Sequence, residues 1–176
     1  MFYRGVVENN ADPKQLGRVQ VRVFGIHDSG SNVSSSALPW AEVSGGTDFG
    51  LYQGVGITSI LRKGTLVWLF FHNEDYNYPI IFAVIKGKGD INDVAKGSYA
   101  DIATIKTASG NIIEIGDGAG AEKIEIKHMS GTKIVLEPDG SILIESTNNI
   151  VQKATSNDTN QVGGNKKITA SNIFLN

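Results

Sequence analysis

The chain has 176 residues, 40% of them hydrophobic, and carries a formal net charge of −2. This near-neutral charge gives no strong electrostatic attraction to nucleic acid or to an anionic membrane, and the absence of cysteine excludes disulfides and thiolate metal sites. The length suits one domain, or one small domain with an extended appendage. With 21 glycines against 4 prolines, the composition favours long strands joined by glycine-marked turns over a helical protein.

Residues 1–27 are predicted to form a β-hairpin. Three valines alternate with three polar residues over positions 18–23, which is the period of a strand with one face in solvent. Asp12-Pro13 provides the turn before this strand, and Gly17 permits a backbone conformation that a β-carbon opposes.

Three further strands are predicted at 38–43, 63–71 and 79–84. The middle one is nearly all apolar, so both of its faces are expected to be covered. Long loops over 28–37 and 44–60 separate the strands. Five strands with no convincing helix predict a small antiparallel barrel of the OB-fold type.

Three short runs in this region carry a family resemblance. They are GRVQVRVFGIH at 17–27 after the Asp-Pro turn, LPW at 38–40, and a Gly-Thr strand start at 64–65, followed after an acidic turn by Pro-Ile at 79–80. Together they resemble the OB-fold domain of the central spike proteins of contractile phage tails, and of the related valine-glycine repeat spikes of type VI secretion. The aspartate that often precedes the turn in those families is replaced around Asn9-Asn10, a minor departure.

A repeated pattern begins after residue 101. The segment 105–115 recurs 21 residues later at 126–136, sharing Ile-Lys, Ser-Gly and then Ile-x-Ile or Ile-x-Leu, and a shorter unit follows at 139–145. Repeats of this kind predict stacked strand–turn units that bury their apolar faces only against neighbours. We therefore expect the alternating apolar positions to form the core of a trimer: Ile113, Ile115, Ile124, Ile126, Ile134, Leu136, Ile142 and Ile144.

The resemblance implies an all-β chain in three parts. These are a five-stranded OB-fold barrel at 1–85, a linker at 86–101 and an intertwined trimeric β-helix shaft at 102–176.

The final stretch, beyond Ser146, is polar with only scattered apolar residues. A monomer could not bury enough surface to order it, so composition alone predicts disorder. The alternative is that several chains intertwine, with Ile150, Val162 and Ile168 on a shared axis, and the preceding repeats favour this second interpretation.

No catalytic, cofactor-binding or metal-binding residue is predicted, and the protein is not expected to be an enzyme. His27, His72 and His128 form neither His-x-His nor His-Glu-x-x-His, so the iron tip that some related spikes hold through His-x-His is not carried over. Glu74 and Asp75 are adjacent, which predicts a solvated turn rather than the spaced carboxylate pair of a glycosidase. The linker of about sixteen residues is too short for the lysozyme domain that some phage spikes insert there.

Two other classes of function stay open. An OB-fold could bind single-stranded nucleic acid through a basic, aromatic face: Arg18 and Arg22 share a face with Gln20, and Trp40 and Trp68 could stack on bases. The acidic charge opposes this interpretation, as do the apolar runs, which are expected to place both tryptophans in the core. The chain could also be a fragment of a cell-wall hydrolase whose catalytic domain lies elsewhere.

The sequence thus predicts a homotrimeric central spike of a contractile phage tail, with a type VI secretion spike as the alternative. The barrel would dock to the baseplate hub or a tail-tube protein through its loops at 28–37 and 44–60, and the shaft would pierce the host envelope. A separate tip protein is a further candidate partner, whereas nucleic acid is not expected. Such a spike would be assembled in the host cytoplasm and end up in the tail baseplate of the virion.

Overall fold

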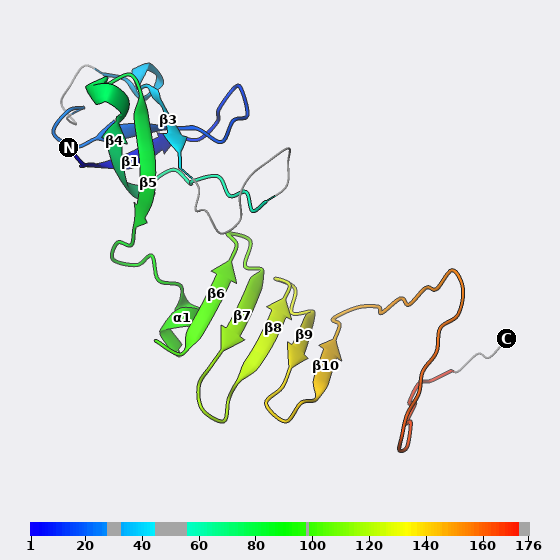
Figure 1. The fold of residues 1–176 in the computed structure, drawn as a ribbon. Helices are drawn as coiled ribbons and strands as arrows, with labels where there is room; N and C mark the ends of the chain where they lie inside the picture. The colour runs from blue at the N-terminus through cyan, green and yellow to red at the C-terminus, as the bar shows by residue number, and fades with distance from the viewer. Residues whose placement is uncertain (28–32, 45–55, 98, 173–176) are drawn as a thin grey trace. The chain divides into compact units, whose positions relative to one another are not determined.

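The chain divides into two compact units, Met1–Asn92 and Asp93–Asn176 (Figure 1). The computed structural model describes residues 1–27, 33–44, 56–97 and 99–172.

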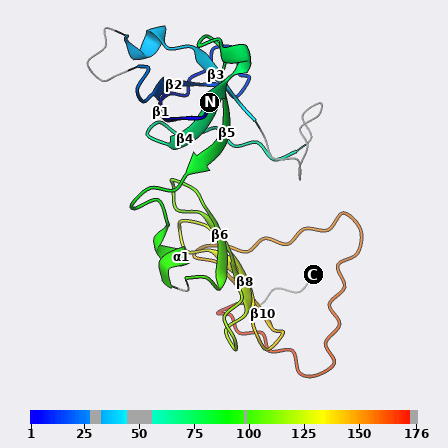
Figure 2. The same ribbon diagram turned by 60° about the vertical axis from the view of Figure 1, so that its left-hand side comes forward.

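The first unit is a closed five-stranded barrel, as the sequence predicted (Figure 2). The strand order is β1-β2-β3-β5-β4, and β4 returns to pair with β1. The strands are β1 (Tyr3–Asn9), β2 (Val19–Val23), β3 (Trp40–Val43), β4 (Leu66–Phe71) and β5 (Pro79–Ile85). Two short 3-10 turns, η1 (Ser35–Ala37) and η2 (His72–Glu74), lie before β3 and after β4.

The barrel interior is filled by alternate residues of all five strands. On β2 the three valines of the predicted pattern are at most 1% exposed. Each buried side chain of this size contributes roughly 1.5–3 kcal/mol to folding, so the alternation over β2 is a major stabilising feature. The core set is Val7, Val19, Val21, Val23, Ala41, Val67, Leu69, Phe71 and Ile81.

Gly5 allows β1 to reach both of its neighbours, because it pairs with Val23 of β2 and Val67 of β4. A β-carbon at this position would lie 2.5 Å from Val21 Cγ1 and 2.8 Å from the carbonyl oxygen of Arg22. Both distances are shorter than contacts between real atoms, so closure of the barrel at this point requires glycine.

Three expectations about the barrel were wrong. Strands β3 and β5 pair in parallel, with Glu42 opposite Ile80, so the barrel is not wholly antiparallel. Gln20, expected on the solvent face of β2, is 3% exposed, because its amide donates to the carbonyl of Leu38 and is enclosed there. The apolar strand β4 is covered on one face only: Trp68 is 38% exposed, because alternate residues of β4 point away from the core.

The second unit is a five-stranded antiparallel meander, in which each strand pairs with the next (Figure 1). Its strands are β6 (Ile102–Lys106), β7 (Ile112–Gly116), β8 (Lys123–Lys127), β9 (Lys133–Leu136) and β10 (Ile142–Glu145). Within the segment expected to be a linker lies the short helix α1 (Asp93–Gly97), whose Asp93 carboxylate pairs with Lys106 of β6. No helix in the described ranges is long or apolar enough to cross a membrane.

Three hairpin turns of the second unit, at 107–111, 128–132 and 137–141, have the same hydrogen bonds. In each, the first residue donates its N–H to the carbonyl of the last, at 2.8–2.9 Å, and the glycine donates to the carbonyl of the first, at 2.9–3.1 Å. The glycines have φ values of 96°, 100° and 82°, a region that L-residues with side chains rarely adopt. The Ser-Gly and Asp-Gly pairs of the sequence repeat therefore encode these turns.

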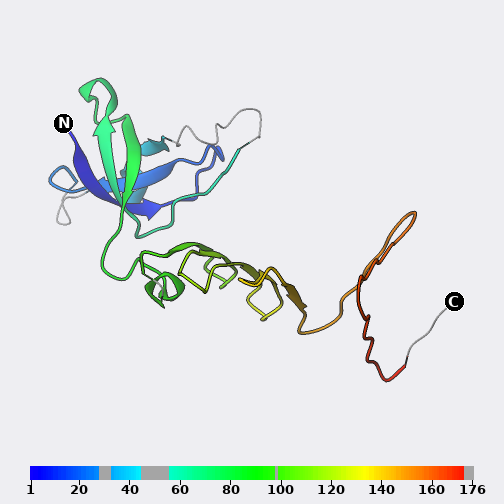
Figure 3. The same cartoon turned by 60° about the horizontal axis from the view of Figure 1, so that its bottom comes forward.

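These turns reverse the chain directly, so consecutive strands of the second unit pair with one another in a meander. The trimeric β-helix expected over 102–176 stays a prediction. Residues 146–172 contain no strand and continue from β10 as an extended segment (Figure 3).

We predict that Gln20→Leu lowers the free energy of unfolding of the barrel by about 1–3 kcal/mol. The Gln20 amide donates to the Leu38 carbonyl at 2.5 Å and accepts from Asn9 Nδ2 at 2.8 Å, so leucine would leave both partners unsatisfied. Urea unfolding of the intact chain followed by tryptophan fluorescence reports on the barrel, because both tryptophans lie there. Gln152→Leu, at an exposed position of the extended segment, is the control, and an unchanged midpoint for Gln20→Leu would contradict the prediction.

Candidate docking groove and assembly face

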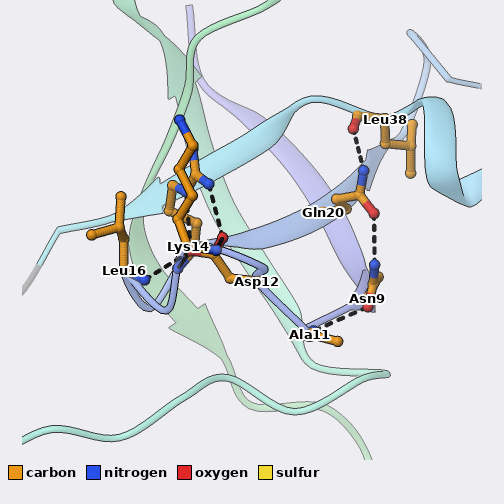
Figure 4. A network of polar contacts seen from close by, with 8 residues as sticks. Asn9, Ala11, Asp12, Lys14, Leu16, Gln20 and Leu38 are labelled. Atoms are coloured by element: carbon orange, nitrogen blue, oxygen red, sulfur yellow. Dashed lines mark hydrogen bonds and ion pairs between the residues drawn. The ribbon is translucent and has the colours of Figure 1, made fainter.

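The turn between β1 and β2 is organised by the Asp12 carboxylate. It accepts backbone N–H groups from Lys14 and Leu16 at 3.0 Å, and a more distant one from Arg18 at 3.4 Å (Figure 4). The Arg18 guanidinium adds two further donors, Nε at 3.1 Å and Nη2 at 2.8 Å. Hydrogen bonding by Arg18 and by these backbone amides holds the pKa of Asp12 well below its usual range. The turn is thereby rigid, and the charge of Arg18 is neutralised.

A second ion pair fastens the chain that leaves β2. Arg22 donates to Glu8 from Nε at 2.5 Å and Nη2 at 3.0 Å, and also to the carbonyls of His27 and Val33. Ser35 donates to the same Glu8 carboxylate at 2.6 Å. Hydrogen bonds from Arg22 and then Ser35 lower the pKa of Glu8. The two ends of the β2–β3 connection are therefore tied to β1 and β2.

Both tryptophans lie outside the core, so the expectation that they would be buried there was wrong. The guanidinium carbon of Arg18 lies 5.6 Å from the ring centroid of Trp40, and that of Arg4 lies 5.8 Å from the ring of Trp68. Each tryptophan thus combines a half-covered ring with an arginine at cation–π distance.

A groove with a volume of about 570 Å³ lies on the barrel between the β1–β2 turn and the β4–β5 connection. Its walls include Arg18, Trp40, Glu42, His72, Tyr78 and Pro79. The sequence interpretation did not identify this groove, because its residues come from four separate parts of the chain. The sequence offered one indication of the groove. The LPW run at 38–40 and the acidic turn before Pro79 both lie beside predicted strand ends.

The wall supplied by the β4–β5 connection is a tight turn. The N–H of His72 donates to the carbonyl of Tyr78 at 2.9 Å, and Asp75 accepts from both the backbone and the side chain of Asn77. Asn73 and Glu74 have φ values of 50° and 62°, in the left-handed region that non-glycine residues adopt at a cost. Glu74 and Asp75 are both exposed, and Asp75 serves to close the turn.

The second unit has an apolar face made of two ladders that cross all five strands. One ladder aligns Ile105, Ile113, Ile126, Ile134 and Ile144, and the other aligns Ala103, Ile115, Ile124, Leu136 and Ile142. The eight residues named from the sequence all belong to these ladders and are 41% to 64% exposed. The structure adds Ala103 and Ile105, which the alternation over β6 could have indicated. We call these ten residues the assembly face.

The opposite face of the same sheet carries the charged side chains of the central strands, together with Ile112 and the buried Val135. Lys123 lies between two carboxylates, 3.2 Å from Glu114 and 3.0 Å from Glu125. Hydrogen bonding to Glu125 and Glu114 raises the pKa of Lys123, while Lys133 pairs with Glu145 at 3.2 Å. The sheet therefore has one face that mixes ion pairs with a few apolar residues and one face of uninterrupted apolar side chains.

The histidines lie on three separate segments, in the turn after β2, in η2 and in the β8–β9 turn. His27 accepts the N–H of Val23 at Nδ1, and its burial, with the nearby charge of Arg22, lowers its pKa. Among the residues that the structure describes, no three histidine or carboxylate side chains gather as they would around a metal ion. Of the two loops expected to dock, positions 28–32 and 45–55 lie outside the described residues.

We predict that Asp12→Asn destabilises the barrel at pH 7 and that this deficit shrinks in acid. A carboxyl whose pKa is lowered in the folded state stabilises the fold above its unfolded pKa of about 3.9. That contribution is lost as the pH falls through the folded pKa. The difference in urea midpoint between the two proteins should therefore be constant down to about pH 4 and decrease below it. Asp158→Asn in the extended segment is the control, and a deficit independent of pH would contradict this role for Asp12.

The comparisons with known proteins match this geometry. Residues 3–85 match the family model described as the type VI secretion system/phage-baseplate injector OB domain, and this range runs from the first residue of β1 to the last of β5. No curated protein matches the chain. The family match agrees with the closed barrel and with the resemblance carried by the β1–β2 region. The N-terminal barrel of this chain is therefore an injector OB domain of the family shared by type VI secretion systems and phage baseplates.

Proposed function

We propose that the chain is the central spike of a contractile phage tail, in which three copies assemble around one axis. One observation carries the proposal: an injector OB barrel is followed in the same chain by a sheet with one wholly apolar, unpartnered face. A baseplate role follows from the barrel's family. The trimer, the shaft and the piercing role are inferred from the second unit.

In the proposed trimer, each chain contributes one sheet, and the three assembly faces meet at the axis. Such packing removes the two ladders from water. A contiguous exposed apolar surface of this kind is rare on a monomer, which favours the trimer. The faces with Lys123 and its two carboxylates turn outward to solvent. Further along, the three extended segments wind together, with Ile150, Val162 and Ile168 toward the axis.

The proposed mechanism is mechanical. The barrels dock to the baseplate hub or a tail-tube protein, and sheath contraction drives the shaft through the host envelope. A shaft that transmits force must unfold slowly, which chains wound around one another provide, since none can leave alone. No residue is assigned a catalytic role, and no cofactor is required. A separate tip protein at the end of the shaft fits the same mechanism.

Assembly in the host cytoplasm and incorporation into the virion baseplate complete this proposal. A type VI secretion spike is the alternative within the same family. A nucleic-acid module is disfavoured because Arg18, just before β2, and Arg22 of β2, which would contact phosphates, are paired with Asp12 and Glu8. A cell-wall hydrolase fragment would need a catalytic domain outside this chain.

The oligomeric state tests the proposal directly. Light scattering at micromolar concentration should give three times the 18.8 kDa mass of the chain. The trimer should also resist SDS in the cold and dissociate only on heating, because of slow unfolding. A monomeric mass, or immediate dissociation in cold SDS, would contradict an interwound shaft.

Two neighbouring substitutions on β8 test the assembly face. Ile126 belongs to it, whereas Lys127 is on the opposite face of the same strand, and both are exposed in the single chain. Ile126→Asp would bury three carboxylates at the axis, at a cost of several kcal/mol, so gel filtration should show loss of trimer. Lys127→Asp should leave the trimer intact. The reverse result would place the axis on the other side of the sheet.

A further inference from the structure

The groove between the β1–β2 turn and the β4–β5 connection is formed before any partner arrives. The Asp12 hydrogen bonds hold one wall, and the bonds from His72 to Tyr78 and from Asn77 to Asp75 hold the other. The groove is lined by β3 and by the β1–β2 and β4–β5 connections, which belong to the face through which OB-folds bind oligonucleotides and oligosaccharides. A preformed groove binds an extended ligand without the entropic cost of ordering its own walls.

The groove surface is apolar and contains hydrogen-bond donors that are not used. The rings of Trp40 and Tyr78, with Pro39, Pro79 and Ile80, provide flat apolar surfaces. Neither the indole N–H of Trp40 nor the hydroxyl of Tyr78 has a hydrogen-bond partner among the described residues. This combination fits a polyproline II segment, which presents apolar rings and has free carbonyls around its axis.

The charged side chains of the groove favour a ligand that carries a positive charge. Arg18 is committed to Asp12 through two side-chain hydrogen bonds, so its charge is compensated. Glu42 is exposed and makes no hydrogen bond or ion pair with a described residue, and its charge interacts with Arg18 only through space. Asp12 and Glu42 are two carboxylates beside one guanidinium, so this side of the groove keeps a net negative charge. Such a charge attracts a lysine or arginine beside the apolar anchor and repels phosphate. A neutral saccharide would use the rings but would leave this charge unpaired.

We propose that this groove binds an extended, proline-containing segment with a neighbouring lysine or arginine, which belongs to a tail component and anchors the barrel in the baseplate. The inference rests on the proposed function, which supplies the baseplate, but it names a contact that the family match does not. Tyr78 and Trp40 hold the apolar part of the segment, and Glu42 pairs with its cation.

Substitutions test the contact in assembled particles. Glu42→Lys should reduce incorporation of the chain into tails about tenfold or more, because the new lysine would repel the cation of the bound segment. Tyr78→Ala should reduce incorporation by a similar factor, because it removes one of the rings that hold the apolar part of the segment. Glu42→Gln should have an intermediate effect. Tyr99→Ala is the matched control, because Tyr99 is 75% exposed in the second unit and Tyr78 is 62% exposed in the groove. All variants should still give the trimer in solution, since no substituted residue is on the assembly face.

Photo-crosslinking identifies what occupies the groove. With p-benzoylphenylalanine at position 78 in assembled tails, mass spectrometry should find a crosslink to a different tail protein, within a segment that contains proline and lysine or arginine. The same label at position 99 should not give that crosslink. A crosslink to a saccharide, to another copy of this chain, or to a segment without those residues would overturn the inference. So would normal incorporation of both Glu42→Lys and Tyr78→Ala. Failure of the proposed function is distinguishable, because the unsubstituted chain would then be monomeric or absent from tails.

Discussion

The need to remove one apolar sheet face from water is the constraint on which the organisation of the second unit depends. Strict alternation along β6–β10, together with in-register pairing, collects ten apolar residues into two ladders on one side. A one-residue slip of any strand would move its apolar side chains to the face that holds Lys123 and its carboxylates. Register and amphipathicity therefore support each other, and both lead to the proposed trimer.

The barrel has a different structural role, because its core and its hydrogen-bonded connections give it a rigid surface. Its small core is made mostly of valines, and closure depends on the close approach of β1 and β2 at Gly5. The connections are held by carboxylates: Asp12 gathers the β1–β2 turn, and Glu8 fastens the chain around Arg22. These ion pairs also compensate the arginines. The groove therefore lacks the basic character of an OB surface that binds nucleic acid, and Glu42 gives it an exposed carboxylate.

Much of this protein was predictable from its sequence. The valine alternation over 18–23 predicts β2, the glycine-marked turns predict the hairpins of the second unit, and the runs at 17–27 and 38–40 predict the family of the barrel, which the match over 3–85 confirms. These features are local, because strand period and positive-φ turns depend on neighbouring residues. The alternation of apolar and polar residues over 113–144 likewise predicted eight residues that lie on one face of the second unit's sheet.

Other features were decided only by the tertiary structure, because they depend on which distant segments meet. Gln20 alternates with the buried valines of β2, as a solvent-facing residue would, but the chain at Leu38 closes over it. Trp68 is part of an apolar run, but it faces outward because its neighbours fill the barrel. The groove is assembled from the β1–β2 turn, β3, η2 and β5. By itself, the sequence determined the strands and turns through local periodicity. Long-range packing determined which faces are covered and where polar groups converge, since burial is a property of the whole fold.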